Sequence, residues 1–184
     1  MHGFILTRLE HFVTETFGAG AWEQIREKAG KPGRVYVNLL EYSDEEVQAL
    51  VAAASEVAGL SPAEVLEAYG KSLGPELVRI YRPLLSDGWR TLEVLENTED
   101  TIHEVVRRRN RRAAPPFLST RRSGPQEVTL VYNSPRKMCA LARGIALGLA
   151  EHFEERVEVA EDSCMHRGDE ECVMRVRAAG AGAS

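Results

Sequence analysis

The proline pair Pro115-Pro116 divides the chain into two parts whose apolar residues follow different periodicities. Before the pair, apolar residues recur at helical spacing; after it, segments alternate between apolar and polar residues as strands do. Four strands are expected there, over residues 117–121, 127–133, 157–161 and 172–177. A helix over 135–153 separates these strands into two pairs. We therefore expect an α+β fold, with a helical N-terminal portion packed on a four-stranded antiparallel sheet that one helix crosses.

Start and stop signals divide the part before the prolines into helices. Two short helices are expected on either side of Gly18-Ala19-Gly20, and a third over 44–58 is ended by Gly59. The segment Ser61-Pro62-Ala63-Glu64 is a capping box with proline at the first helical position. Two further helical segments are expected, over 74–87 and 89–109. We treat the chain as one domain, with a helical portion (1–112), a sheet-containing portion (113–178) and a tail (179–184).

The composition, 43% apolar and 28% charged over 184 residues, is typical of a globular protein. The net charge of −5 argues against a nucleic-acid-binding protein. A run of arginines is expected to be a solvated helix end: Arg107, Arg108, Arg109, Arg111 and Arg112. No apolar stretch approaches the ~20 residues of a membrane span, and the pattern of a signal peptide is missing. We expect a cytoplasmic protein, whose three cysteines are not a disulfide framework.

His103 is a histidine on an otherwise apolar helix. The buried stripe of that helix is expected to contain Leu92, Leu95, Ile102 and Val106, with His103 facing inward at its edge. An isolated histidine in such a place is more often a hydrogen-bonded core residue than a metal ligand. Both interpretations stay open on this segment alone.

Tyr132, Ser134 and Arg136 form the second notable pattern. Two residues apart on a strand, Tyr132 and Ser134 project from the same face. Ser134 followed by Pro135 predicts a helix N-cap and first helical position, so that Arg136 lies in the opening turn. Hydroxyl donors, a guanidinium and a helix N-terminus at one place would bind paired carboxylates or a phosphate. With a neutral imidazole for an iron, the ligand that these groups indicate is haem.

Several segments together resemble one family. They are Met1-His-Gly-Phe-Ile5, Ala52-Ala-Ala-Ser55-Glu-Val, the helix carrying His103, Pro115-Pro116 and Tyr132-x-Ser134-x-Arg136. In their order and spacing, over roughly residues 1–178, they resemble the haem nitric oxide/oxygen-binding (H-NOX) domains, the sensor modules of soluble guanylate cyclases and their bacterial relatives. The stand-alone bacterial sensors are the type that this chain is similar to.

The resemblance implies a haem b between the helical portion and the sheet. His103 would be the axial ligand of the iron, and Tyr132, Ser134 and Arg136 would hold the propionates. Arginine can bind a carboxylate through two charge-assisted hydrogen bonds, while hydroxyls donate to the other carboxylate. The resemblance also implies that Pro116 and Ile5 pack on a distorted porphyrin.

The distal side of that haem is expected to lack hydrogen-bond donors. Oxygen-binding relatives carry a tyrosine five residues after the motif arginine, and here that residue is Leu141. Leu73 and Leu77 are placed on the same side. A missing hydrogen bond costs the bound oxygen about 1–1.5 kcal/mol, and more when the acceptor is charged. We therefore expect a sensor that binds nitric oxide and carbon monoxide and excludes oxygen.

Cysteine and histidine cluster near the end of the chain, in Cys164-Met-His166 and at Cys172. With Cys139 on the helix after the haem motif, they offer a Cys3His set that suits tetrahedral zinc. The alternative is that Cys139 is a small buried apolar residue and that the other two cysteines are free thiols. Some members of the resembling family carry zinc on cysteines and histidine at this end of the chain.

The function that follows is sensing rather than catalysis. No serine or cysteine nucleophile with base spacing and no glycine-rich phosphate loop is present. The resemblance implies that nitric oxide breaks the His103–iron bond, and that the change of shape is read in trans by a histidine kinase or a cyclic-dinucleotide enzyme. We expect neither nucleic acid nor a membrane as a partner. The alternative is a haem-independent interaction module that senses redox state through zinc and thiols.

Overall fold

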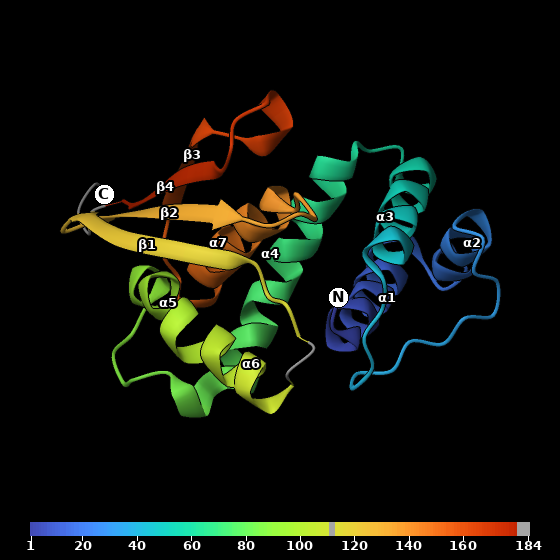
Figure 1. The fold of residues 1–184 in the computed structure, drawn as a ribbon, viewed down its shortest axis with the longest axis horizontal. Coiled ribbons are helices and arrows are strands. Elements are labelled where there is room, and N and C mark those ends of the chain that lie inside the picture. The colour runs from blue at the N-terminus through green and yellow to red at the C-terminus, as the bar shows by residue number, and fades with distance from the viewer. Residues whose placement is uncertain (111–112, 180–184) are drawn as a thin grey trace.

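The computed structural model describes residues 1–110 and 113–179. Figure 1 shows helices α1 to α3 at one end of the molecule and a sheet with α5, α6 and α7 at the other, with the long helix α4 between them. The fold is the mixed helix-and-sheet arrangement expected from the sequence. Most of the expected tail, like Arg111 and Arg112 of the arginine run, lies outside the described residues.

The helices before the prolines follow the local start and stop signals in part. They are α1 (Gly3–Phe17), α2 (Ala21–Lys28), α3 (Asp44–Ala58), α4 (Pro62–Tyr81), α5 (Thr91–Asn97) and α6 (Glu104–Arg109). Gly59 ends α3 in the left-handed conformation at φ 66°, and Ser61 caps α4 through the predicted capping box. The single helix expected over 89–109 is instead α5, a π-helical turn η2 (Glu99–His103) and α6.

The separate helix predicted over 74–87 is wrong, because α4 continues through Gly70, Gly74 and Pro75 to Tyr81. These glycines serve packing instead of ending the helix. A Cβ at Gly70 would lie 2.4 Å from the Leu141 carbonyl oxygen, and one at Gly144 would lie 2.1 Å from that of Glu67. Gly74 and Gly148 repeat this close approach one turn further along. Helix α4 therefore packs backbone to backbone against α7 (Cys139–His152).

The sheet is antiparallel throughout, in the order β1-β2-β4-β3. Its strands are β1 (Phe117–Gly124), β2 (Glu127–Asn133), β3 (Val157–Ser163) and β4 (Cys172–Ala178), each within three residues of its predicted bounds. Across the sheet, Leu118 is opposite Tyr132, and Tyr132 is opposite Cys172. This row of residues joins the Tyr132-x-Ser134-x-Arg136 segment to the cysteine-rich end of the chain.

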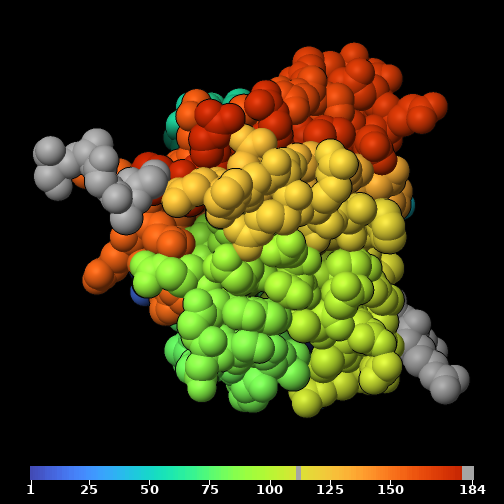
Figure 2. All heavy atoms as spheres, turned by 90° about the vertical axis from the view of Figure 1, so that its left-hand side faces the viewer, coloured from blue at the N-terminus to red at the C-terminus, as the bar shows by residue number. Residues whose placement is uncertain are grey.

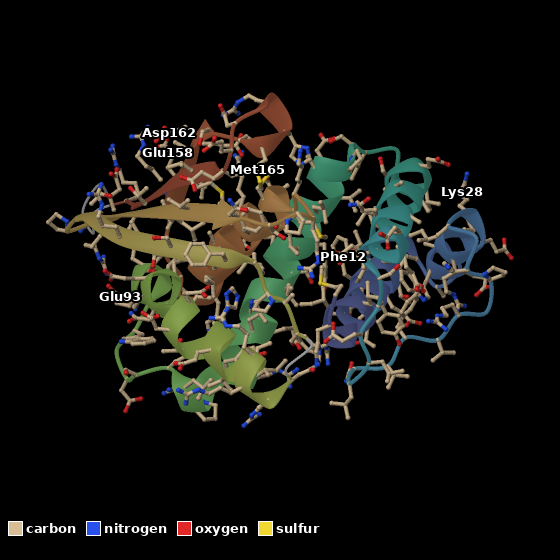
Figure 3. The ribbon with its side chains drawn as sticks, viewed as in Figure 1. Phe12, Lys28, Glu93, Glu158, Asp162 and Met165 are labelled. Atoms are coloured by element: carbon tan, nitrogen blue, oxygen red, sulfur yellow. The ribbon has the colours of Figure 1, made fainter. Side chains whose placement is uncertain are left out.

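One face of the sheet is apolar and packs on the helices, and the other is charged. Val128, Met174 and Val176 belong to the buried core on the inner side. Glu158 and Asp162 on β3 are exposed, and Figure 3 shows them on the side of the sheet away from the helices. Seen from the sheet end, the β1–β2 hairpin packs between the segment of α5 and α6 and the C-terminal hairpin (Figure 2).

Two hydrophobic clusters form the interior. One gathers α1, α2, α3 and the first half of α4, and includes Phe12, which Figure 3 labels near α1. The other lies between the sheet, α5 and α7. Ile145 on α7 packs against both clusters, and α4 contributes Leu73 to one and Val78 to the other, so these two helices join the clusters.

Within residues 1–110 and 113–179, no single helix has the length and apolar character of a membrane span. Only α3 taken together with the stretch 62–84 meets that test, and this pair is bent by 99°.

Replacing Gly144 by alanine tests the close packing of α4 and α7. The added methyl group would meet the α4 backbone, which cannot move aside as a flexible side chain would. We expect the free energy of unfolding to fall by about 1–3 kcal/mol, the usual cost of overpacking. Gly20→Ala is the matched control, because Gly20 has right-handed helical geometry and no close neighbour. Urea denaturation would measure both variants, and equal midpoints would contradict the packing role.

Candidate functional site

His103 lies at the end of a π-helical turn between α5 and α6. The His103 and Ile102 amides both approach the Thr98 carbonyl oxygen, at 3.0 Å each, which marks the widened turn. Such turns are rare and are frequent at functional sites. The His103 side chain is only 14% exposed, so it faces inward as the apolar stripe predicts.

One ring nitrogen of His103 is held by a carboxylate. Nδ1 lies 2.8 Å from Glu99 Oε2, and since a carboxylate only accepts, Nδ1 donates its proton. Burial lowers the pKa of His103. The hydrogen bond to Glu99 raises it, but the effect of burial is larger. Among the residues that the structure describes, Nε2 has no hydrogen-bond partner. A neutral imidazole held in this way offers the Nε2 lone pair to a metal.

The turn that carries Tyr132, Ser134 and Arg136 differs from the prediction. Helix α7 begins at Cys139, not at Pro135, because Lys137 adopts a left-handed conformation at φ 51°. Ser134 therefore does not cap the helix; its hydroxyl accepts the Arg136 amide at 3.3 Å, within a short turn. The helix N-terminus that was expected beside Arg136 is therefore not part of this site.

Tyr132 and Ser134 are nevertheless buried side by side, each 3% exposed. The Tyr132 hydroxyl accepts the Met138 amide at 3.1 Å and lies beside the Ser134 hydroxyl, and it still has one proton to donate. Burial raises the pKa of Tyr132, so this hydroxyl keeps that proton at neutral pH.

Arg136 links the two ends of the molecule. Its Nε donates to Asp44 at the start of α3 over 2.6 Å, and one terminal nitrogen donates to the Ala114 carbonyl over 2.7 Å. The N-terminal ammonium of Met1 lies 3.6 Å from the same Asp44 carboxylate. A guanidinium has five N–H groups, so donors beyond these two are available for a carboxylate of a ligand.

The residues predicted on the distal side come together. Leu73 is a buried member of the N-terminal hydrophobic cluster, and Ile5, Leu77 and Leu141 pack against that cluster. The Tyr69 hydroxyl is close to this group, but it donates to the Ile5 carbonyl at 2.6 Å. Pro116 is partly buried directly ahead of β1.

The three cysteines meet in the interior. Cys164 Sγ lies 3.7 Å from the sulfurs of both Cys139 and Cys172, and all three lie within 4.8 Å of one another. Burial raises the pKa of the Cys139 and Cys172 thiols. Two sulfurs on one tetrahedral zinc are about 3.8 Å apart, so the spacing suits that metal.

His166, the fourth member of the expected set, is outside this group. Its side chain is exposed, and Nε2 lies 2.7 Å from the Lys137 carbonyl oxygen. Lys137 is two residues before Cys139, so His166 is held beside the cysteine cluster without pointing into it.

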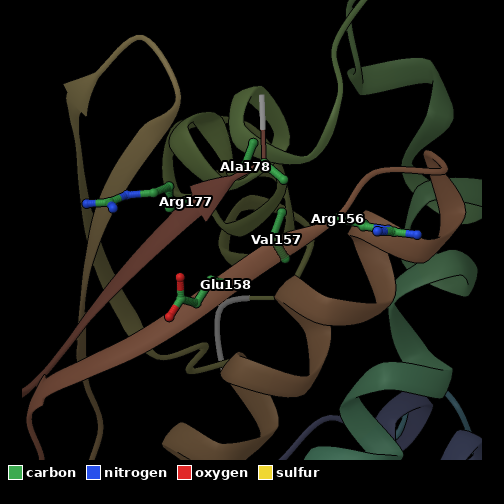
Figure 4. A pocket seen from close by; sticks show the side chains of 6 residues that line it. Arg156, Val157, Glu158, Arg177 and Ala178 are labelled. Carbon is green, nitrogen blue, oxygen red and sulfur yellow. The ribbon is translucent and has the colours of Figure 1, made fainter. Parts of the chain in front are cut away.

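Two surface hollows lie away from all these residues. One of about 260 Å³ is at the end of the β3–β4 hairpin opposite Cys172, between Val157 and Ala178 (Figure 4). The other, of about 160 Å³, is on the charged face of the sheet and is lined in part by Arg177. Arg177 pairs with Glu127 at 2.8 Å, as expected for a solvated sheet face.

A helical part packed on a four-stranded antiparallel sheet is the fold of the haem-containing gas sensors. The chain belongs to the haem-NO-binding (H-NOX) family, whose model matches residues 2–161.

Solved structures agree with this assignment. An H-NOX protein from Shewanella oneidensis in the Fe(II)NO state is 25% identical, with a TM-score of 0.89 over 98% of this chain and 100% of that one. The Fe(II)CO form of an H-NOX domain from that organism gives a TM-score of 0.86 at 25% identity, over 98% and 99% of the two chains. An unliganded H-NOX protein from K. algicida, at 22% identity, shares the fold with a TM-score of 0.86 over both whole chains.

Two partners of the site were missed from the sequence. Glu99 precedes His103 by four residues, a spacing that places two side chains together on a helix and could have identified it. Asp44 is 92 positions from Arg136, and nothing local links them. Arg107 was expected to be solvated, but it pairs with Glu99 at 2.7 Å.

Proposed function

We propose that this protein is a nitric oxide sensor that holds haem b between its helical part and its sheet, with His103 as the axial ligand. The observation that carries the proposal is the inward-facing, neutral His103, whose Nδ1 is occupied by Glu99 and whose Nε2 is not. When bound, the haem would supply an iron that takes diatomic gases. Membership of the haem-NO-binding family supports this cofactor.

The residues present fit the acidic edge of such a group. Tyr132 and Ser134 offer buried hydroxyls, and Arg136 offers guanidinium donors beyond those that Asp44 and Ala114 use. A propionate would form charge-assisted hydrogen bonds with these groups. Ile5 and Pro116 would pack on the face of the ring and distort it.

The sensing step would be the loss of the bond between His103 and iron. His103 would hold the iron, and nitric oxide on that iron would weaken this bond, so the helix that carries His103 would be free to move. The two parts of the molecule would then shift relative to each other, as a two-state sensor requires. We propose that a separate histidine kinase or cyclic-dinucleotide enzyme reads this shift in trans, as the family resemblance implies.

Selection among gases would rest on the apolar distal group. Leu73, Leu77 and Leu141 offer no hydrogen bond, and the Tyr69 hydroxyl already donates to a backbone carbonyl. Bound oxygen is more polar than bound nitric oxide or carbon monoxide, so it loses most from this environment. We propose that the protein binds the latter two gases and excludes oxygen.

A visible absorption spectrum of the full chain tests the proposal. Ferrous protein should show a strong Soret band that shifts with nitric oxide to the form lacking a histidine ligand. His103→Gly should change the spectrum of the gas-free protein, and added imidazole should restore it. A colourless protein that takes up no haem would contradict the proposal and favour the zinc–thiol module.

Leu141→Tyr tests the basis of oxygen exclusion. A tyrosine hydroxyl at this place on α7 should donate to bound oxygen and strengthen its binding by about 1.5–3 kcal/mol, or roughly 10- to 150-fold. Leu141→Phe adds the ring without the hydroxyl and is the matched control. Oxygen titration of the ferrous proteins would measure both. Equal oxygen affinity in the two variants would show that another feature excludes oxygen.

We further propose that the cysteine cluster holds a structural zinc ion. The three buried sulfurs already have the spacing of a tetrahedral site. A nearby divalent cation would reverse the raised pKa values, because it stabilises thiolates. His166 lies beside the cluster, and rotation of its side chain away from Lys137 would supply the fourth ligand.

Metal analysis tests this site. The full chain should retain one zinc ion per molecule after dialysis, whereas Cys172→Ser should lose it and His166→Ala should bind it more weakly. His152→Ala, which removes an exposed histidine at the end of α7, is the control and should keep the zinc. Full-length protein that binds no zinc with all cysteines reduced would overturn the proposal.

A further inference from the structure

We infer that Glu99 is a positioning residue for the iron ligand, and that its carboxylate strengthens the bond between His103 and iron. The inference rests on the proposed role of His103. Glu99 contacts Nδ1 of the imidazole, the nitrogen that would not bind the metal. Glu99 is also outside the Tyr132-x-Ser134-x-Arg136 motif.

The carboxylate of Glu99 is held from three directions. Oε2 accepts from His103 Nδ1 at 2.8 Å and from the Leu118 amide on β1 at 3.2 Å. Oε1 accepts from Arg107 at 2.7 Å. The Glu99 side chain is only 17% exposed, so this carboxylate has little freedom to turn away from the imidazole.

A common explanation for a glutamate four residues before a histidine is a surface ion pair worth about 0.3–0.5 kcal/mol. The observations here differ from that case. Both side chains are largely buried and lie in a π-helical turn. The Leu118 amide, which also donates to Glu99, belongs to a strand that is distant in sequence. Asp100, the neighbouring carboxylate in the same turn, is exposed and makes the useful contrast.

A negative acceptor at Nδ1 has a defined effect on a metal at Nε2. It fixes the tautomer and the ring orientation, and it makes the imidazole a stronger base and a stronger ligand. A stronger ligand would resist displacement when a gas binds the iron. It also favours the ferric over the ferrous state, because the added negative charge stabilises the higher oxidation state.

Glu99→Gln in the haem-loaded full chain tests the inference. The substitution keeps the shape of the side chain but removes its charge. We expect the iron–histidine stretching frequency of the ferrous protein, measured by resonance Raman spectroscopy, to fall, and the reduction potential to rise. Asp100→Asn removes a charge one residue away and should leave both values as in the wild type. Equal values in Glu99→Gln and the wild type would overturn the inference.

A second measurement avoids any change at Glu99. In His103→Gly protein, free imidazole can donate a proton to Glu99, whereas 1-methylimidazole cannot. Loss of an outer hydrogen bond costs about 10- to 100-fold in metal binding, so imidazole should bind the iron that much more tightly. The preference should shrink when Glu99→Gln is added, because a neutral amide oxygen is a weaker acceptor than a carboxylate. Any steric effect of the methyl group would be the same in both proteins.

These results separate the two claims. If His103→Gly leaves the spectrum of the haem protein unchanged, His103 is not the ligand and the proposed function fails. If His103 is the ligand but neither Glu99→Gln nor the imidazole comparison shows an effect, only the role of Glu99 is excluded. If Glu99→Gln fails to retain haem, the imidazole comparison in His103→Gly alone decides.

Discussion

The close packing of α4 against α7 is the contact on which the rest of the structure depends. Glycines at the crossing let the two backbones approach so closely that a single Cβ at Gly70 or Gly144 would overlap the opposing chain. This crossing brings Leu73 of α4 and Leu141 of α7 into the same hydrophobic cluster. It also holds α7 against the sheet, so the positions of the proposed distal leucines and of Cys139 both depend on it.

The proposed haem edge and the cysteine cluster share one short segment. Tyr132 is opposite Cys172 in the sheet, and its hydroxyl accepts the Met138 amide one residue before Cys139. A metal on the cysteines would thus hold the segment that positions Tyr132. Metal loss or thiol oxidation would release that segment, because a structural metal stabilises the fold around it. The two proposed sites are therefore neighbours that would affect each other.

Features that depend on local patterns could be predicted, and those that depend on distant contacts could not. Strand alternation placed the sheet, and helical spacing placed His103 on the inner side of its helix. Gly74 and Pro75 resemble a helix end in the sequence, yet the partner that explains them lies on α7. Ser134-Pro135 resembles a helix start, but Lys137 and the hydrogen bond at Met138 delay α7 until Cys139. The Arg136–Asp44 pair likewise joins segments without any shared local pattern.

Glu99 occupies the point where the proposed iron ligand meets the sheet. One carboxylate oxygen accepts from both His103 and the Leu118 amide, so these two donors compete for its charge. Release of His103 from the iron would change how strongly its Nδ1–H donates to Glu99. The hydrogen bond from the Leu118 amide to the same oxygen would then become stronger or weaker. Coupling of this kind is reciprocal: a partner that shifted β1 would alter the strength of the iron ligand by the same free energy. Gas binding would then affect the sheet through the hydrogen bond between the Leu118 amide and Glu99, as well as through the movement of the helix.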